Sequence, residues 1–320
     1  MDKKTHAHHL KVTSRFETNL ALEPDARLFG RENELTSLYT SLKEDTRWVS
    51  LVGPPGVGKT ALARHLGARW HARALGEAWL CDLSNAAEVL DVVNVVARTL
   101  GVQLRAQALE PAIAQLGEAL AYRERALIVL DNCEQLSTEA LALPQVWLTQ
   151  ASDIRFLTTS RARLDVPQKT ARLLAPLGHP DEDASASVLA QHAAVQLFVE
   201  RARRAAPGLH FDHNTLKAIA SIAQRVDGLP LALELAASRT TILDPADILV
   251  HLNQSLDVLS RADQATSLRG AIDSSWASLS PWEQATFAQC AVFRGAFAVE
   301  AAEAVVELDH PTPPLVMDVL

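Results

Sequence analysis

One stretch of eight residues constrains the fold more than any other part of this chain. Gly53-Pro54-Pro55-Gly56-Val57-Gly58-Lys59-Thr60 fits the pattern G-x-x-x-x-G-K-[ST] in full. A glycine-rich turn lets backbone N–H groups converge on a phosphate chain without Cβ clashes, and a helix beginning there adds the positive end of its dipole. In this pattern the lysine reaches the β- and γ-phosphates, and the hydroxyl residue ligates Mg²⁺. The segment therefore predicts a nucleotide site in which Lys59 binds phosphate and Thr60 binds Mg²⁺.

The residues around this motif have the pattern that such a turn requires. Residues 48–52 are predicted to form a strand that runs into the turn, and a helix is predicted to begin at its end. Further strands are predicted at 78–83, 127–130, 154–159 and 171–174, and helices at 85–100 (capped by Asn85 and stopped by Gly101) and 108–122. Strands that alternate with helices predict a parallel α/β sheet with right-handed crossovers.

After Leu177 the strand patterns stop and only helical patterns follow. Helices are predicted at 186–206, 214–226, from 231 to 238, and at 268–279, 281–292 and 297–306. Within Gly228-Leu229-Pro230-Leu231, Gly228 would stop one helix and Pro230 would occupy the first turn of the next. The second part of the chain is therefore predicted to be a helical domain packed after the α/β domain.

Composition and charge exclude several classes of protein. The chain has 320 residues, 48% of them hydrophobic and 21% charged, as expected for a globular protein of two or three domains. A formal charge of −8 argues against direct nucleic-acid binding by this region. Cys81, Cys133 and Cys290 have neither disulfide nor zinc spacing. There is no apolar run long enough to span a membrane and no secretory signal, so a cytoplasmic location is expected. Residues 1–26 lack periodicity and predict a flexible tail.

A second candidate for the site follows the apolar run 127–130. Asp131 comes directly after this run, which has the composition of a strand buried on both faces of a sheet. An acid at the carboxyl end of such a strand, one strand away from the phosphate loop, holds the water shell of Mg²⁺. Asp131 is therefore predicted on the metal side. Glu134 has two interpretations, as the base that orients the attacking water or as a solvated glutamate at a helix start.

Polar residues also end the next predicted strand, at Thr158-Thr159-Ser160-Arg161. Groups at this place can sense the γ-phosphate, and Arg161 could neutralise the charge that develops during transfer. The alternative is that Arg161 is a surface residue in a loop. The ring of Pro230 offers a flat face on which an adenine could stack. The arginines at 201, 203 and 204 are predicted to form a solvated helix face.

Taken together, these motifs resemble the STAND class of signal-transduction ATPases. The resemblance is to the nucleotide-binding regions of large bacterial transcription regulators of the AfsR/LuxR type, which are related to NB-ARC modules. It covers residues 28–306 and rests on Phe29-Gly30-Arg31-Glu32, the phosphate loop, Leu130-Asp131-Asn132-Cys133-Glu134, Thr159-Ser160-Arg161, Gly228-Leu229-Pro230-Leu231, and Leu268-Arg269-Gly270-Ala271-Ile272-Asp273 with Leu279-Ser280.

The resemblance implies three parts after the tail. These are an α/β P-loop NTPase domain with helices on both faces of its sheet (27–177), a helical lid (178–262) and a winged-helix domain (263–320) that begins near Thr266 and is cut short. The backbone at Phe29, Gly30 and Arg31 would cradle the base and Pro230 would pack on it, while the loop from Gly53 through Ala61 would bind the rest of the nucleotide.

In proteins of this class, ADP holds a closed monomer, and ATP with a signal opens it for assembly. The implied ligands are ATP or ADP with Mg²⁺. The implied partners are further copies of the chain and sensor or effector domains outside this region. Asn132 stands where relatives often carry a second acid, which predicts slow hydrolysis.

Two other functions use the same phosphate loop. A motor or loader of the AAA+ type, working as a ring, needs an arginine finger and a substrate loop that no residue here identifies. A small-molecule kinase needs an acceptor pocket and less helical chain. Turnover separates these classes, since a switch should be slow while a motor or kinase should reach about 1–100 per second.

Overall fold

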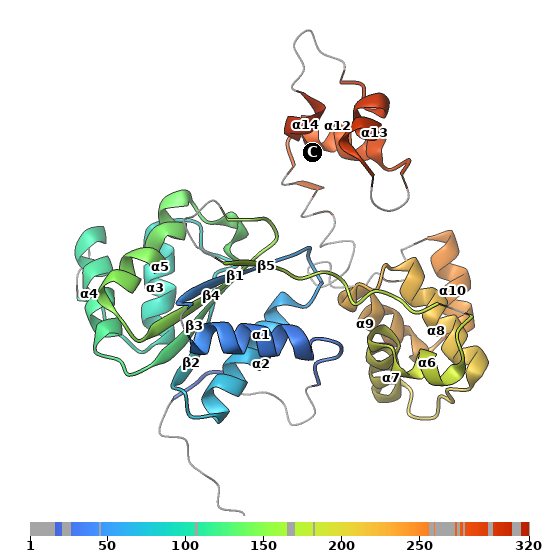
Figure 1. Ribbon diagram of the computed structural model, residues 1–320, viewed down its shortest axis with the longest axis horizontal. Helices are drawn as coiled ribbons and strands as arrows, with labels where there is room; N and C mark the ends of the chain where they lie inside the picture. The colour runs from blue at the N-terminus through green and yellow to red at the C-terminus, as the bar shows by residue number, and fades with distance from the viewer. Residues whose placement is uncertain are drawn as a thin grey trace, which may run out of the picture. The chain divides into compact units, whose positions relative to one another are not determined.

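The computed structural model describes most of the chain, namely residues 17–20, 27–44, 46–105, 108–164, 170–181, 183–255, 259, 273, 276–277, 279–293, 297–308 and 315–319. It divides into two compact units, Met1–Leu249 and Val250–Leu320 (Figure 1). Most of the predicted tail, Thr266 and the motif at 268–272 lie outside the described residues.

Five parallel strands form one sheet in the first unit, in the order β2-β3-β4-β1-β5. The strands are β1 (Trp48–Val52), β2 (Glu77–Asp82), β3 (Ala126–Asp131), β4 (Ile154–Ser160) and β5 (Ala171–Leu173). Each lies within one residue or so of its predicted range. The helices of this part are α1 (Glu32–Lys43), α2 (Lys59–Ala72), α3 (Val89–Thr99), α4 (Leu109–Ala121) and α5 (Thr138–Gln150).

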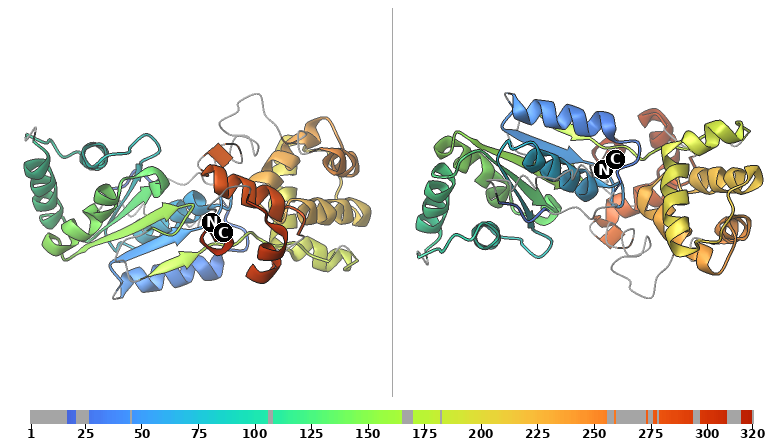
Figure 2. Two further views of the ribbon diagram at one scale, coloured as in Figure 1. Left: turned by 90° about the horizontal axis from the view of Figure 1, so that it is seen from above. Right: turned by 90° about the horizontal axis from the view of Figure 1, so that it is seen from below.

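Helices cover both faces of this sheet (Figure 2). Apolar residues of α1 and α2 pack in one core with Leu51 and Val129. Residues of α3, α4 and α5 pack in another with Ile128 and Phe156. Alternate residues of a strand point to opposite faces of the sheet. Since helices cover both faces, β3 and β4 are buried at every position. The predicted α/β P-loop fold with a helical region after it is therefore confirmed.

The predicted start of α3 was wrong. Asn85 lies in a turn, whereas Glu88 is the N-cap and forms a capping box with Asp91. The Asp91 carboxylate accepts hydrogen bonds from the N–H groups of Ala87 and Glu88, both at 3.1 Å. Because Asp91 accepts from these two N–H groups, the helix is capped at Glu88 and begins three residues later than predicted.

Five helices follow the sheet: α6 (Ala186–Gln191), α7 (Ala193–Ala205), α8 (His213–Arg225), α9 (Pro230–Ser238) and α10 (Pro245–Gln254). The single helix predicted at 186–206 is in fact two. His192 has an extended backbone, and its ring nitrogen Nδ1 accepts from the N–H of Ala194, so it caps α7. The break lets Ala193 approach Gly30, a tertiary contact that helical periodicity does not reveal.

Residues 17–20, which the sequence places in the tail, pair with the edge of the sheet. Thr18 forms a parallel bridge with β2. The side chain of Asn19 exchanges two hydrogen bonds with the backbone of Leu80, at 2.8 and 2.9 Å. Leu20 is buried among the α1 and α2 side chains. This segment covers an edge strand that would otherwise present unpaired backbone groups.

The second unit contains α12 (Pro281–Cys290), α13 (Val299–Val305) and α14 (Val316–Val319), around a small cluster that includes Cys290 and Ala302. No strand occurs among the described residues of this unit, so the winged-helix assignment stays a prediction. All three cysteines of the chain are free and buried. In the part of the chain that the structure describes, none of the helices combines the length and apolar character needed to cross a bilayer.

Candidate functional site

The phosphate loop joins the end of β1 to the start of α2. Gly56 and Gly58 have φ angles of 76° and 97°, in the left-handed region that favours glycine. The buried Lys59 Nζ donates to the carbonyl oxygens of Gly53 at 2.7 Å and Pro54 at 3.1 Å. The ammonium group thus lies against the loop's own backbone, in the concave turn where a phosphate chain would bind.

Three other predicted side chains lie close enough to affect the charge of Lys59. Burial lowers the pKa of Lys59, the carboxylates of Glu134 and Asp131 raise it, and Arg161 lowers it. These residues come from α2, the end of β3, the short 3₁₀ helix η1 (Cys133–Gln135) and the segment after β4. The structure therefore gathers at one edge of the sheet the four charged residues that the sequence singled out.

Asp131 and Thr60, the two residues predicted to bind Mg²⁺, are hydrogen-bonded to each other in this cluster. The Thr60 hydroxyl donates to Asp131 Oδ1 at 3.1 Å, and the Thr159 hydroxyl donates to the same oxygen. Mg²⁺ prefers oxygen ligands and is usually bound by one or two carboxylates together with substrate phosphates. A carboxylate beside a hydroxyl at the phosphate loop fits that donor set. Among the described residues no group of three or more His, Cys, Asp or Glu offers a different metal site.

Because Asp131 is buried, we expect Asp131→Asn to stabilise the fold and to weaken the binding of ATP with Mg²⁺. Burial raises the pKa of Asp131, against hydrogen bonds from Thr159 and Thr60 that lower it. The folded chain therefore binds this proton more tightly than the unfolded chain, and stability falls as pH rises from the ordinary pKa towards the folded one. Asp131→Asn keeps an oxygen for both hydroxyls and removes the buried charge. We expect a higher melting temperature without Mg²⁺ at neutral pH, and at least about tenfold weaker Mg²⁺-dependent ATP binding.

Thermal scans between about pH 4 and 8, with ATP titrations in Mg²⁺ and in EDTA, test this expectation. The melting temperatures of the variant and the wild type should converge at the acid end, where Asp131 is protonated. A variant less stable than the wild type at every pH would contradict it.

Asn132 directs the chain away from β3 towards Arg161. Its φ of 64° lies in the left-handed region, which asparagine tolerates better than most residues. Its N–H donates to the Thr159 hydroxyl and its side-chain amide donates to Asp82, both at 3.0 Å. The helix η1 (Cys133–Gln135) begins directly afterwards. Asn132, which stands where relatives often carry a second acid, thus forms the turn that precedes Glu134.

Glu134 lies beside Arg161 rather than in open solvent. Arg161 Nε and Glu134 Oε1 are 2.8 Å apart, and the Glu134 side chain is 21% exposed. Its other oxygen, Oε2, is buried without a hydrogen-bond partner. Glu134 is thus partly buried and paired, and its role as the base that orients water stays a prediction.

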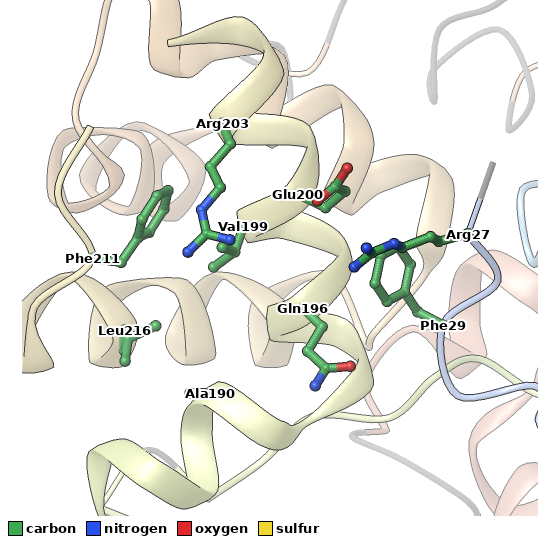
Figure 3. Close-up of a pocket in the computed structure, with 9 residues that line it drawn as sticks. All are labelled: Arg27, Phe29, Ala190, Gln196, Val199, Glu200, Arg203, Phe211 and Leu216. Atoms are coloured by element: carbon green, nitrogen blue, oxygen red, sulfur yellow. The ribbon is translucent and has the colours of Figure 1, made fainter. Parts of the chain in front are cut away.

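A pocket beside the phosphate loop, called the nucleoside pocket below, is lined in part by residues that the sequence predicts to bind nucleotide. It is lined by Phe29, Arg31, Val57, Gly58, Ala61 and Pro230 of the predicted set, and by Arg27, Leu28, Leu177, Leu197, Arg201 and Glu234. The lining therefore combines apolar residues with four charged side chains around a space of about 70 Å³. Arg27 and Phe29 also line a second pocket of about 360 Å³, together with residues of α7 such as Gln196, Val199 and Arg203 (Figure 3).

Gly30 and Arg31 hold the first wall of this pocket in place. Gly30 has a φ of 62°, and a Cβ there would lie 2.5 Å from the Cβ of Ala193 in α7. The buried Arg31 guanidinium donates to the carbonyl of Ala175 at 2.5 Å and to that of Val57 at 3.5 Å. Arg31 therefore fastens the segment before α1 to the phosphate loop.

The start of α9 rests on the phosphate loop. The N–H of Leu231 donates to the carbonyl of Gly56 at 3.1 Å, and the N–H of Leu177 donates to the carbonyl of Gly228 at 3.1 Å. A Cβ on Gly56 would lie 2.8 Å from that of Leu231. Pro230 occupies the first helical position of α9, as predicted. Leu231 was not predicted as a site residue, since a backbone contact leaves no trace in the sequence pattern.

Arg201 is 36% exposed and makes an ion pair that the prediction of a solvated helix face did not include. Its Nη2 lies 2.9 Å from Glu234 Oε1, so an ion pair joins α7 to α9 at the nucleoside pocket. Arg203 lies over the ring of Phe211, and Arg204 pairs with Glu200. Arg201 and Glu234 are 33 positions apart on separate helices, so no local spacing could have identified the pair.

Comparisons with known proteins agree with this geometry. Residues 43–159 match the family model of the AAA domain. The chain is 31% identical over 283 residues to the "Uncharacterized protein Rv0894" of Mycobacterium tuberculosis, which covers 86% of this chain and 68% of that protein. It is 31% identical over 287 residues to the "Putative HTH-type transcriptional regulator Rv0890c" of the same organism, which covers 88% of this chain and 30% of that protein.

Among solved structures, Cdc6p from Pyrobaculum aerophilum has a similar fold. Its TM-score is 0.53 at 19% sequence identity, over 83% of this chain and 74% of that chain. The aligned part of this chain therefore extends beyond the residues of the five-stranded sheet.

Proposed function

Because this chain belongs to the protein family of the mycobacterial Rv0894 and contains an AAA-type P-loop ATPase domain, we propose that it is a nucleotide-driven switch of the STAND class. In this proposal ATP and ADP, with Mg²⁺, control a closed and an open state of a signalling or transcription-regulatory protein. The observation that carries it is the hydrogen bond from Leu231 of α9 to Gly56, which connects the lid directly to the phosphate loop.

The charged cluster would bind the phosphates as follows. Lys59 would leave the carbonyls of Gly53 and Pro54 and donate to the β- and γ-phosphates. Thr60 and Asp131 would hold Mg²⁺, which neutralises phosphate charge when bound. This exchange replaces contacts within the empty loop by contacts with ligand, so binding of nucleotide does not leave the buried ammonium unpaired.

Hydrolysis would use Glu134 and Arg161. Glu134 would orient the attacking water and accept its proton, and Arg161 would stabilise the charge on the transferred phosphoryl group. The ion pair between them supports slow turnover, since Glu134 Oε1 must separate from Arg161 before both can act in these roles.

Coupling to the lid follows from the two places where nucleotide would meet α9. The base would lie between residues 29–31 and Pro230, and the phosphates would lie in the loop that Leu231 contacts. A ligand shifts a conformational equilibrium only through different contacts in the two states. We therefore infer that ADP holds the lid on the loop, and that ATP with a signal releases it for self-association.

The output of the switch is proposed from the relatives. The chain spans 30% of Rv0890c, whose printed name is that of an HTH-type transcriptional regulator, so sensor or effector domains beyond this region would complete the protein. Transcription regulation is accordingly the proposed setting, with this region itself making no direct nucleic-acid contact. The cytoplasmic location stays a prediction.

Lys59→Ala tests the nucleotide site itself. Because Lys59 should contact both terminal phosphates, the variant should bind ATP at least tenfold more weakly, a loss of about 1.4 kcal/mol in calorimetry. Lys217→Ala removes a lysine on α8 that pairs with Asp183, and it should bind ATP as the wild type does. Equal affinity in the wild type and Lys59→Ala would remove the phosphate-loop assignment.

Turnover and bound nucleotide distinguish the switch from an AAA+ ring motor. ADP released from the denatured, purified protein would favour a resting switch. A rate of about 1–100 per second, reached without a signal, would instead favour the motor.

A further inference from the structure

The lid side of the nucleoside pocket ends in a charged pair that the proposed function leaves without a role. We propose that Glu234, held by Arg201, recognises the ribose of the bound nucleotide by accepting hydrogen bonds from its hydroxyls. This inference rests on the proposed nucleotide site and adds a residue that determines which sugar the site accepts.

Arg201 holds the Glu234 carboxylate through one of its two oxygens. Arg201 donates to Glu234 Oε1 from both Nε, at 3.1 Å, and Nη2, at 2.9 Å. Both contacts use Oε1, and the structure shows no hydrogen bond to Oε2 among the described residues. The arginine therefore fixes the carboxylate and balances its charge, while one oxygen can still accept from a ligand.

The position of the pair favours the sugar rather than the base. Glu234 follows Pro230 by four residues in α9, and Arg201 follows Leu197 by four in α7, so each helix presents an apolar and then a charged residue on one face. Leu197 is buried, whereas the side chains of Arg201 and Glu234 are 36% and 39% exposed. A base suits the buried apolar end, and a sugar suits the half-exposed end.

The phosphate-loop residues of the pocket lead to the same assignment. Val57, Gly58 and Ala61, from the phosphate loop and the first turn of α2, line the same pocket as Glu234. The sugar of a nucleotide must lie between its phosphates in that loop and its base. A carboxylate cannot donate to phosphate, but it accepts from vicinal hydroxyls, as acidic residues do at the ribose in dinucleotide sites.

Sugar preference is the quantity to measure, by calorimetry on the full chain with ADP, 2′-deoxy-ADP and 3′-deoxy-ADP. The wild type should prefer ADP to at least one deoxy analogue by about tenfold, the effect of one hydrogen bond to a charged group. Glu234→Ala should lose that preference, mainly through weaker ADP binding. Glu234→Gln, which keeps an acceptor oxygen without the charge, should retain part of it.

Glu200→Ala is the matched control. It removes an equivalent carboxylate that pairs with Arg204 on α7 but does not line the nucleoside pocket, and its sugar preference should equal that of the wild type. Inorganic tripolyphosphate should bind Glu234→Ala and the wild type equally, since the phosphate contacts are intact.

Four results would overturn the proposal. The first is a wild type without sugar preference, and the second is an unchanged preference in Glu234→Ala. The third is a loss of tripolyphosphate binding in Glu234→Ala. The fourth is that Glu234→Ala no longer distinguishes ADP from IDP but keeps its sugar preference. The last would assign Glu234 to the amine of the base. A wild type that binds no ADP at all would instead refute the proposed function.

Discussion

Gly228→Ala should destabilise the first unit by about 3 kcal/mol, although it adds only a methyl group. Gly228 has a φ of 62°, where an L-residue costs about 1–2 kcal/mol. A Cβ there would lie 2.1 Å from the carbonyl oxygen of Gly178 and 2.6 Å from its C and N. These are backbone atoms that cannot rotate away, so the turn must move, at a further cost of about 1–3 kcal/mol.

The movement should also weaken the contact between lid and phosphate loop. Gly228 accepts a hydrogen bond from Leu177, and three residues on Leu231 donates to Gly56. Urea unfolding measures the loss of stability, and the ADP-induced rise in melting temperature, which should shrink, measures the coupling. Gly208→Ala is the control, because a Cβ at Gly208 meets nothing within 4 Å and its φ is not positive. Equal stability of the two variants would contradict the account of this turn.

Glu134→Gln should lower ATP turnover by at least about 100-fold and leave ATP affinity nearly unchanged. The amide has the shape of the carboxylate and can still lie near Arg161, but it cannot accept a proton from the attacking water. Phosphate release at saturating ATP measures the rate, and calorimetry measures binding. Loss of affinity with an unchanged bound-state rate would assign Glu134 to binding instead.

The matched control for this experiment is Glu139→Gln. Glu139 is an exposed residue in the first turn of α5, the kind of position that the alternative interpretation gave to Glu134. It should hydrolyse ATP at the wild-type rate. Equal hydrolysis in Glu134→Gln and the wild type would make Glu134 a structural partner of Arg161 and no more.

Local patterns in this sequence predicted the core of the fold well. Five strands and the turn of the phosphate loop were recognised because they depend on nearby residues: apolar runs for strands buried on both faces, and glycines where φ is positive. Asp131 was found for the same reason, since a polar residue directly after a buried strand is visible in one dimension. These features need only the physics of a few adjacent residues.

Errors arose where several neighbours competed or a distant contact decided the outcome. Asn85 and Glu88 could both cap α3, and the second acid at Asp91 decided between them. The break occurs at His192, whose side chain caps α7, and it lies next to a close approach of Ala193 to Gly30, more than 160 positions earlier in the chain. Helical periodicity continues through both places and therefore could not locate either boundary.

By itself, then, the sequence determined the strands, the phosphate loop and the residues that end neighbouring strands. Only the tertiary structure decided which of them act together. Parallel strands bring their carboxyl ends to one edge of the sheet, which places Asp131 beside Thr60 and Glu134 beside Arg161. The pair of Arg201 with Glu234 and the bond from Leu231 to Gly56 depend on how the lid helices pack against one another and on the loop, because such contacts join residues whose spacing along the chain has no period.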